Sequence, residues 1–190
     1  MHEHDLPTAL AEDRDGTFAS LVETFQDQLY AFALRLADNP HDAEEIVADA
    51  FVRAYQALGR YPAERIRALL LRPWLYQITR NVFRNHVRGR RWHPMPHDQT
   101  GPEPDMAPTD EAAEQPESVV ERAELREMLT AQVAALPERE RVVVVLHHVQ
   151  GLGYGEIAHM LEQPIGTVKA NVHRGVQRLR AAMDALGEWR

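Results

Sequence analysis

The stretch "YGEIAHMLEQPIGTVKANVHRGVQRLRAAMD" (residues 154–184) contains two amphipathic segments separated by the short turn "EQPI". In the second segment the apolar residues recur at helical spacing, as Val168, Val172, Val176, Leu179 and Met183. A helix, a tight turn and a second helix form a helix-turn-helix, whose second helix can enter the major groove of DNA. Lys and Arg meet guanine edges in that groove, and Asn meets adenine. The stretch therefore predicts a helical DNA reader, and an ordinary amphipathic terminal helix is the alternative.

A proline-rich segment divides the chain upstream of this motif. Residues 92–117, "WHPMPHDQTGPEPDMAPTDEAAEQPE", hold six prolines and seven acids, with no lysine or arginine. Such a composition buries too little apolar surface to offset the entropy of ordering, so we predict a flexible acidic linker. The linker separates a first part, residues 17–91, from a second part, residues 118–184. We predict a disordered acidic tail at 1–16 and a short C-terminal tail at 185–190.

Both parts of the chain are predicted to be helical. In the first part, apolar spacing predicts helices over 17–37, over 40–58 with Asn39 as the N-cap, and from Pro73 to 91. In the second part, Ser118 and Glu121 match a capping box, and the helix that they begin runs to Leu136. The next segment holds four consecutive valines at 142–145, which a strand would also accommodate; its helical start and surroundings favour a helix. The prediction is an all-α fold of two small helical domains.

Charge is unevenly distributed along a chain whose net charge is −8. No acid occurs between Arg65 and His97, and Arg80, Arg84, Arg88 and Arg91 recur on one stripe of the third helix. Asn81 and Asn85 lie beside that stripe. Cations with neighbouring amides and aromatics suit a phosphate backbone and unstacked bases. A solvated basic face is the alternative.

The second helix has the opposite sign on its polar side. Asp42, Glu45 and Asp49 form one stripe away from the apolar face. An isolated acidic stripe usually faces solvent. Beside a surface that binds DNA it would repel phosphates, so it fits a protein partner with a basic surface.

Several classes of function are disfavoured. The chain has no cysteine, which excludes disulfides and thiolate metal sites within it, and it shows no nucleotide-binding or hydrolase motif. His147 and His148 are adjacent, so they cannot form an i, i+4 metal pair. We therefore predict no catalytic residue, no metal and no cofactor. No apolar run reaches the length of a membrane span, which favours a cytoplasmic protein without membrane insertion.

Three segments in this order resemble the extracytoplasmic-function (ECF) sigma factors, in the sigma-70 family of bacterial RNA polymerase subunits. "NPHDAEEIVADAFVRAYQAL" is similar to that family's region 2.2, and "PWLYQITRNVFRNHVRGRR" to its regions 2.3 and 2.4. "LPERERVVVVLHHVQGLGYGEIAHMLEQPIGTVKANVHRGVQRLR" is similar to region 4. The resemblance covers residues 18–91 and 118–183, and the three motifs together are much more specific than any one alone.

The resemblance implies a role for each part. Docking on the β′ coiled coil of core RNA polymerase would fall to Asp42, Glu45, Asp49 and Arg53. Recognition and melting of the −10 promoter element, with capture of a flipped base by the loop 60–72, would fall to Tyr61, Arg65, Arg80, Asn81, Arg84, Asn85, Arg88 and Arg91. Packing on the β flap and reading of the −35 element would fall to region 4, through Thr167, Lys169, Asn171, His173, Arg174 and Arg178. The family also implies an anti-sigma partner and a linker that passes through the active-site cleft.

This sequence departs from the family pattern in the loop 60–72, which is rich in Leu and Arg, and at three other places. The common Gln-Glu of region 2.2 is Ala48-Asp49, the common Ser-Arg after the lysine of the last helix is Ala170-Asn171, and Gly153 replaces a capping Ser or Thr. These departures leave the resemblance to the family intact and affect which promoter sequence the protein would recognise. The main rival function is a stand-alone regulator that binds duplex DNA through 154–184 without polymerase, and an enzyme on a helical scaffold is a distant third.

Overall fold

The computed structural model describes residues 3–92, residue 125 and residues 128–186. These residues form helices joined by short connections, and no strand occurs among them, which confirms the all-α prediction. The helices are α1 (Leu6–Glu12), α2 (Arg14–Ala37), α3 (Pro40–Leu58), α4 (Ala63–Arg67), α5 (Leu71–Trp92), α7 (Glu138–Val144), the π-helical turn η1 (Val145–Val149), α8 (Tyr154–Leu161) and α9 (Ile165–Leu186). Residues 128–135 are also helical and precede α7.

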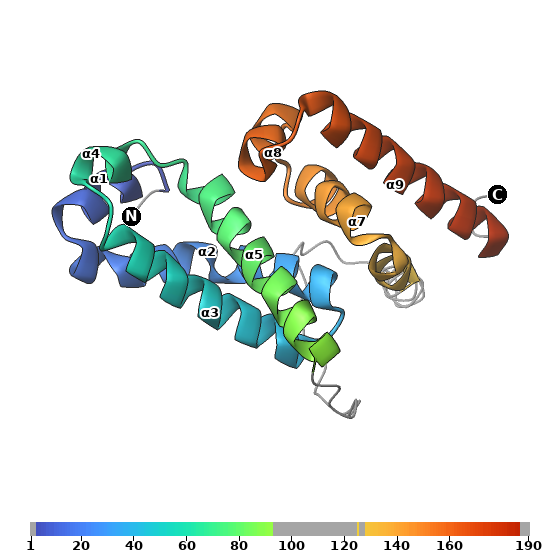
Figure 1. Cartoon of the computed structure of the whole chain (residues 1–190), viewed down its shortest axis with the longest axis horizontal. Helices are drawn as coiled ribbons and strands as arrows, with labels where there is room; N and C mark the ends of the chain where they lie inside the picture. The colour runs from blue at the N-terminus through green and yellow to red at the C-terminus, as the bar shows by residue number, and fades with distance from the viewer. Residues whose placement is uncertain (1–2, 93–124, 126–127, 187–190) are drawn as a thin grey trace, which may run out of the picture.

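The first half is a bundle in which α2, α3 and α5 pack against one another (Figure 1). Side chains fix where the helices begin: Asp13 accepts a hydrogen bond from the N–H of Gly16, and Asn39 accepts one from Asp42, each at 3.0 Å. The core is aromatic and aliphatic, and Phe32 and Tyr76 meet edge to face with ring centres 5.0 Å apart. The predicted helices over 17–37 and 40–58 are confirmed, and α5 begins two residues before Pro73.

The N-terminal segment differs from the predicted disordered tail. Residues 6–12 form α1, which packs against α2 and α4, and α2 begins at Arg14. Leu6 and Leu10 lie one helical turn apart and are 0% and 1% exposed. The prediction was wrong here because a seven-residue helix has too little internal stability to be read from its composition. Its two buried leucines hold it to the bundle instead.

The second half packs α7 and α8 against α9. The valine run is helical, as predicted: Val142 to Val144 end α7, and Val145 begins η1, all of them buried. At the start of α8, Gly153 has no side chain to cap the helix. The Glu156 carboxylate compensates by accepting a hydrogen bond from the Gly153 N–H at 2.8 Å.

The two halves lie against each other across α5 (Figure 1). Tyr76 is fully buried, and its hydroxyl donates to Gln150 Oε1 at 2.6 Å. Arg72 donates to the backbone oxygen of Gln150 at 2.7 Å, and Arg141 donates to that of Leu36 at 2.5 Å. One buried apolar cluster runs through both halves. The predicted linker lies outside the described residues apart from Trp92, as do residues 118–124 and 187–190.

Candidate nucleic-acid interface

The predicted docking stripe on α3 divides between an inward and an outward set. Asp42 is only 6% exposed: Asn39 caps its N–H, and its carboxylate lies 3.3 Å from His86 Nε2 on α5. The expectation that Asp42 faces a partner is therefore wrong. Its neighbour is His86, 44 residues away in sequence, so helical spacing alone did not reveal this contact.

The remaining members of the stripe point outward. Glu45 lies 3.3 Å from His41, and Asp49 forms an ion pair with Arg53 at 2.9 Å, one helical turn along. Val52, between them on the surface of α3, is 54% exposed. The outer side of α3 thus combines carboxylates, one cation and an exposed aliphatic side chain, which suits a protein surface better than water alone.

On α5 the predicted basic stripe also divides. Arg80 is half buried, and burial lowers the pKa of its guanidinium. Arg84 lies 3.6 Å from Glu138 of α7, so it forms an ion pair with the second half of the chain. Asn81, Asn85 and Arg88 are exposed. Arg91 lies in the last turn of α5, and its side chain is outside the described residues.

The loop 60–72 carries a cation–aromatic cluster at its start. The Arg65 guanidinium stacks on the Tyr61 ring at 3.7 Å, and the Tyr61 and Trp74 ring centres are 6.3 Å apart. Leu70 at the other end of the loop is 63% exposed. Leu70 and Trp74 border an open cavity of about 600 Å³. Its lining comes from the loop, from α5 and from α8: Ala68, Leu69, Leu70, Pro73, Trp74, Gln77, Ala158, His159, Met160, Glu162 and Gln163.

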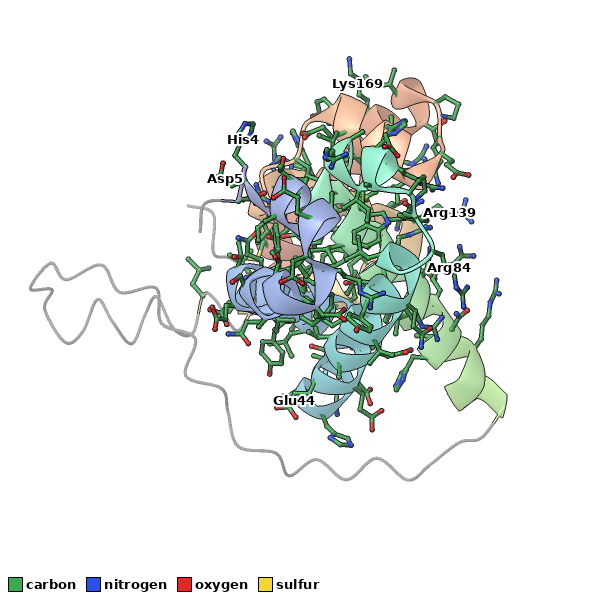
Figure 2. All side chains as sticks on the ribbon, turned by 90° about the vertical axis from the view of Figure 1, so that its left-hand side faces the viewer. His4, Asp5, Glu44, Arg84, Arg139 and Lys169 are labelled. Atoms are coloured by element: carbon green, nitrogen blue, oxygen red, sulfur yellow. The ribbon has the colours of Figure 1, made fainter. Side chains whose placement is uncertain are left out.

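The first turns of α9 present a polar surface. Thr167, Lys169 and His173 are exposed, and Figure 2 shows Lys169 projecting from the outer edge of the molecule. The Lys169 ammonium lies 5.7 Å from the centre of the Tyr154 ring on α8. Tyr154 in turn stacks on His147 with ring centres 4.1 Å apart. The exposed start of α9 therefore rests on an aromatic support from the preceding helix and from η1.

Three other residues predicted to read the −35 element have partners inside the protein. Asn171 is 4% exposed and accepts a hydrogen bond from Arg174. Arg178 and Arg174 lie 2.9 and 3.7 Å from the carboxylate of Glu140, which is only 4% exposed. Asn171 as a direct reader of bases is therefore wrong. The two arginines neutralise a buried acid on α7. This pairing was missed because nothing in the local pattern around Glu140 indicates that it is buried.

An apolar groove of about 800 Å³ lies between α2, residues 128–135, η1 and the end of α9. Its floor is aliphatic, with Val133, Val145 and Met183, and Val149 on η1 is 47% exposed. Arg35, Arg180 and His148 add positive or titratable groups to its lining. Burial lowers the pKa of His148, with a smaller effect from His147, so this imidazole is neutral at neutral pH. The groove suits an apolar segment of another protein.

No group of histidine and acidic side chains within the described residues could hold a metal ion. None of the described helices is both long enough and apolar enough to cross a membrane.

Residues 21–93 match the family model Sigma-70 region 2, and residues 126–179 match Sigma-70, region 4. The chain is 31% identical over 177 residues to the ECF RNA polymerase sigma factor SigW of Bacillus subtilis, covering 92% of each protein. It is 34% identical over 163 residues to the ECF RNA polymerase sigma factor SigE of Mycolicibacterium smegmatis, covering 84% of this chain and 59% of that relative.

Two solved structures have a similar fold. One is CnrH in complex with the cytosolic domain of CnrY, with a TM-score of 0.68, 23% identity and coverage of 96% of this chain and 97% of that one. The other is the sigma factor RpoE in complex with the anti-sigma factor NepR from Bartonella quintana, with a TM-score of 0.65 and 20% identity. This likeness covers 88% of this chain and 96% of RpoE.

Proposed function

The chain belongs to the ECF sigma factors of the sigma-70 family, and from that premise we propose how its surfaces divide the work of promoter-directed transcription initiation. Two polar sets that face outward at different places support the division. One is acidic and lies on α3; the other is basic and lies on α5 and at the start of α9. In Figure 2, Lys169 of α9 and Glu44 of α3 lie at opposite ends of the view.

Core RNA polymerase binds the outer side of α3 in this proposal. Glu45, Asp49 and Arg53 supply charges, and Val52 supplies an apolar contact at the centre of the patch. The acidic groups would meet basic side chains of the β′ coiled coil. The buried Asp42 does not touch the partner. It holds α3 against α5 through its contact with His86.

The β flap would occupy the apolar groove beside η1. Its aliphatic floor and the 47% exposure of Val149 leave apolar area uncovered in the free chain. An apolar segment of the polymerase would remove that area from water, and Arg35 and Arg180 would receive acidic groups at the groove's edge. Core binding would then use one site in each half of the chain.

The −10 element would lie along α5 and the loop 60–72. Arg88, Asn81 and Asn85 face outward to receive phosphates and base edges, and Arg84 becomes fully available once Glu138 moves away. The stacked pair of Tyr61 and Arg65, with Trp74 beside it, offers flat faces for an unstacked base. The open cavity beside Leu70 gives a displaced base a place to enter.

The −35 element would be read by the exposed start of α9. Lys169 carries the cation for a guanine edge or a phosphate, and Thr167 and His173 flank it. Arg174 and Arg178 hold α9 on α7 through Glu140 and reach DNA only at the backbone. Replacement of the family's Ser-Arg by Ala170-Asn171 removes one basic contact to DNA. It also places the buried amide of Asn171 on the inner side of α9.

The remaining assignments follow the family. The chain works in the cytoplasm, catalyses no reaction itself and is held inactive by a separate anti-sigma protein; RpoE and NepR form such a complex. Its acidic linker, residues 92–117, would pass through the active-site cleft and towards the path of the RNA.

Binding to labelled promoter DNA with and without core polymerase distinguishes this proposal from a stand-alone regulator. Promoters come from transcript starts mapped after overexpression. The sigma assignment predicts weak binding by the free chain and specific binding after core enzyme is added. Specific, tight binding of the free chain to duplex DNA, unchanged by core enzyme, would instead support the rival.

A further inference from the structure

The N-terminal helix α1 precedes the part of the chain that matches the family model, which begins at residue 21. It nevertheless packs against α4, the short helix inside the loop 60–72 (Figure 1). Leu6 and Leu10 of α1 are buried, and Ile66 is the buried side chain of α4, at 5% exposure. All three belong to one apolar cluster. The loop proposed to capture a −10 base therefore rests on α1.

A second attachment lies where α1 ends and α2 begins. The Tyr55 hydroxyl donates to the Asp15 carboxylate at 2.8 Å, and Arg14 donates to the Tyr55 oxygen at 3.1 Å. The Arg14 guanidinium also lies over the Tyr55 ring, 4.4 Å from its centre. The hydrogen bonds from Tyr55 and Arg14 lower the pKa of Asp15. Residues 14 and 15 are thus tied to the last turns of α3, immediately before the loop begins.

Arg14 also lies beside Gly59, the residue that ends α3 immediately before the loop. Its guanidinium fills the space where a Cβ at residue 59 would lie, so only glycine fits there without moving it. Gly59 has φ −65°, an ordinary helical value, and the atom nearest to a Cβ at this position is the end of the Arg14 side chain. The segment from α1 to Asp15 therefore contacts the chain just before the loop, at Gly59, and packs against the middle of the loop, where Ile66 lies on α4.

Regular secondary structure contributes little to the shape of the segment between α3 and α5. Its one helix has five residues and no side chain that caps its start. A segment of this kind holds its functional side chains in place only when a rigid neighbour supports it. The functional side chains concerned are Tyr61, two residues before α4, and Arg65, in its first turn, which form the cation–aromatic stack.

We infer that residues 6–15 are a positioning element for recognition of the −10 element: they hold the loop 60–72 so that Tyr61 and Arg65 meet the displaced strand. This inference rests on the proposed function of that loop. Leu6, Leu10 and Arg14 are positioning residues, and none of them touches DNA.

The test compares two leucine truncations in the full chain bound to core polymerase. Leu10→Ala removes buried carbon atoms beneath the loop. Leu29→Ala removes the same atoms from a site that is also 1% exposed, fifteen residues beyond Arg14 on α2, or about 22 Å along the helix. A purely structural role would make both variants lose thermal stability and activity together.

We expect Leu10→Ala to lower the permanganate reactivity of −10 thymines per bound sigma by about tenfold, with core affinity unchanged. Leu29→Ala should leave opening per bound sigma at the level of the unmodified chain. Equal opening by the two variants would overturn the inference. Absence of opening with the unmodified holoenzyme would instead refute the proposed function of the loop.

A milder pair applies if Leu10→Ala does not fold. Gly59→Ala displaces the Arg14 guanidinium from the end of α3 next to the loop, whereas Gly155→Ala adds a methyl group on α8 where nothing lies within 4 Å. Gly59→Ala should reduce −10 opening by about threefold relative to Gly155→Ala. Equal opening by these two variants would also overturn the inference.

Discussion

At the scale of single residues, the carboxylate of Glu140 decides what two arginines of α9 can do. Glu140 is buried on α7, and a buried carboxylate is costly unless cations compensate it. Arg178 lies 2.9 Å from it, closer than Arg174. Lys169, two turns earlier on the same helix, is exposed, and the Tyr154 ring lies beside it. Cations on one helix therefore divide between stability and recognition.

Alanine substitutions separate these two roles. Lys169→Ala should weaken binding of the −35 element by about 1–3 kcal/mol and leave thermal unfolding unchanged. Arg178→Ala should lower the free energy of unfolding by about 1–2 kcal/mol because Glu140 loses its nearer partner. Calorimetry and holoenzyme binding to promoters with and without the −35 element measure both quantities. A destabilised Lys169→Ala protein would contradict the division.

The docking face of α3 offers a second test at this scale. Asp49→Arg breaks the ion pair with Arg53 and places a cation against the basic partner, so core affinity should fall by about tenfold, or about 1.4 kcal/mol. Glu23→Arg makes the same charge change at an exposed position on α2 and serves as the control. Competition against a labelled sigma factor reports the affinities. Equal affinity of the two variants would remove the docking assignment.

At the scale of elements, α5 joins the two halves and also carries the proposed −10 surface. Its buried side holds Leu75 and Tyr76 in the core, and its exposed side carries Asn81, Asn85 and Arg88. The core contacts of the buried side therefore fix the orientation in which α5 exposes its polar side chains to DNA. A loss of basic charge on α5 should therefore affect DNA opening without loosening the bundle.

The double variant Arg84→Ala and Arg88→Ala tests this separation. It should slow open-complex formation by about tenfold or more and leave core affinity within about twofold, because phosphate contacts are lost while α3 is untouched. Stopped-flow fluorescence of a 2-aminopurine in the −10 element follows opening. Arg139→Ala on α7 is the control for loss of an exposed arginine. A parallel fall in core affinity would show that α5 supports docking instead.

Helix starts were predictable where a local signal exists. Asn39 caps α3 as its sequence indicated, because an N-cap acts over three residues. The start of α1 was not predictable, because Leu6 and Leu10 become ordered through their packing against the bundle. In the candidate site, exposure of Lys169 followed from helical spacing. Burial of Asp42 and Asn171 did not, because it depends on how the helices pack together, as the contact of Asp42 with His86 on α5 shows.

At the scale of the whole molecule, the closed packing of the two halves conflicts with the length of a promoter. The −10 and −35 elements lie about 25 base pairs apart, or about 85 Å of B-DNA. In this arrangement α5 and α8 are in contact, and the loop 60–72 shares a cavity with α8. The halves must separate before one chain can reach both elements. The contacts of Gln150 with Tyr76 and Arg72 break in that step.

Tyr76→Phe tests the separation. Burial raises the pKa of Tyr76, so its hydroxyl stays protonated and donates to Gln150. Its loss leaves Gln150 without that donor at a cost of about 1–2 kcal/mol, which should shift the closed-to-open ratio by about tenfold. Because the chain has no cysteine, dyes at Glu23→Cys and Asp184→Cys can report the distance between halves by energy transfer.

Tyr30→Phe is the matched control, because it removes a hydroxyl from α2 that makes no contact with Gln150. The control should keep the energy transfer of the parent protein, whereas Tyr76→Phe should lower it. Identical transfer in both variants would mean that this hydrogen bond does not hold the halves together.

Run-off transcription tests the central claim most directly. The full chain is mixed with core RNA polymerase and a linear template carrying a promoter from mapped transcript starts. The sigma assignment predicts a transcript of defined length that requires the chain, the core enzyme and intact −10 and −35 elements together. A transcript that forms equally well without the chain, or no transcript from any mapped promoter, would contradict it.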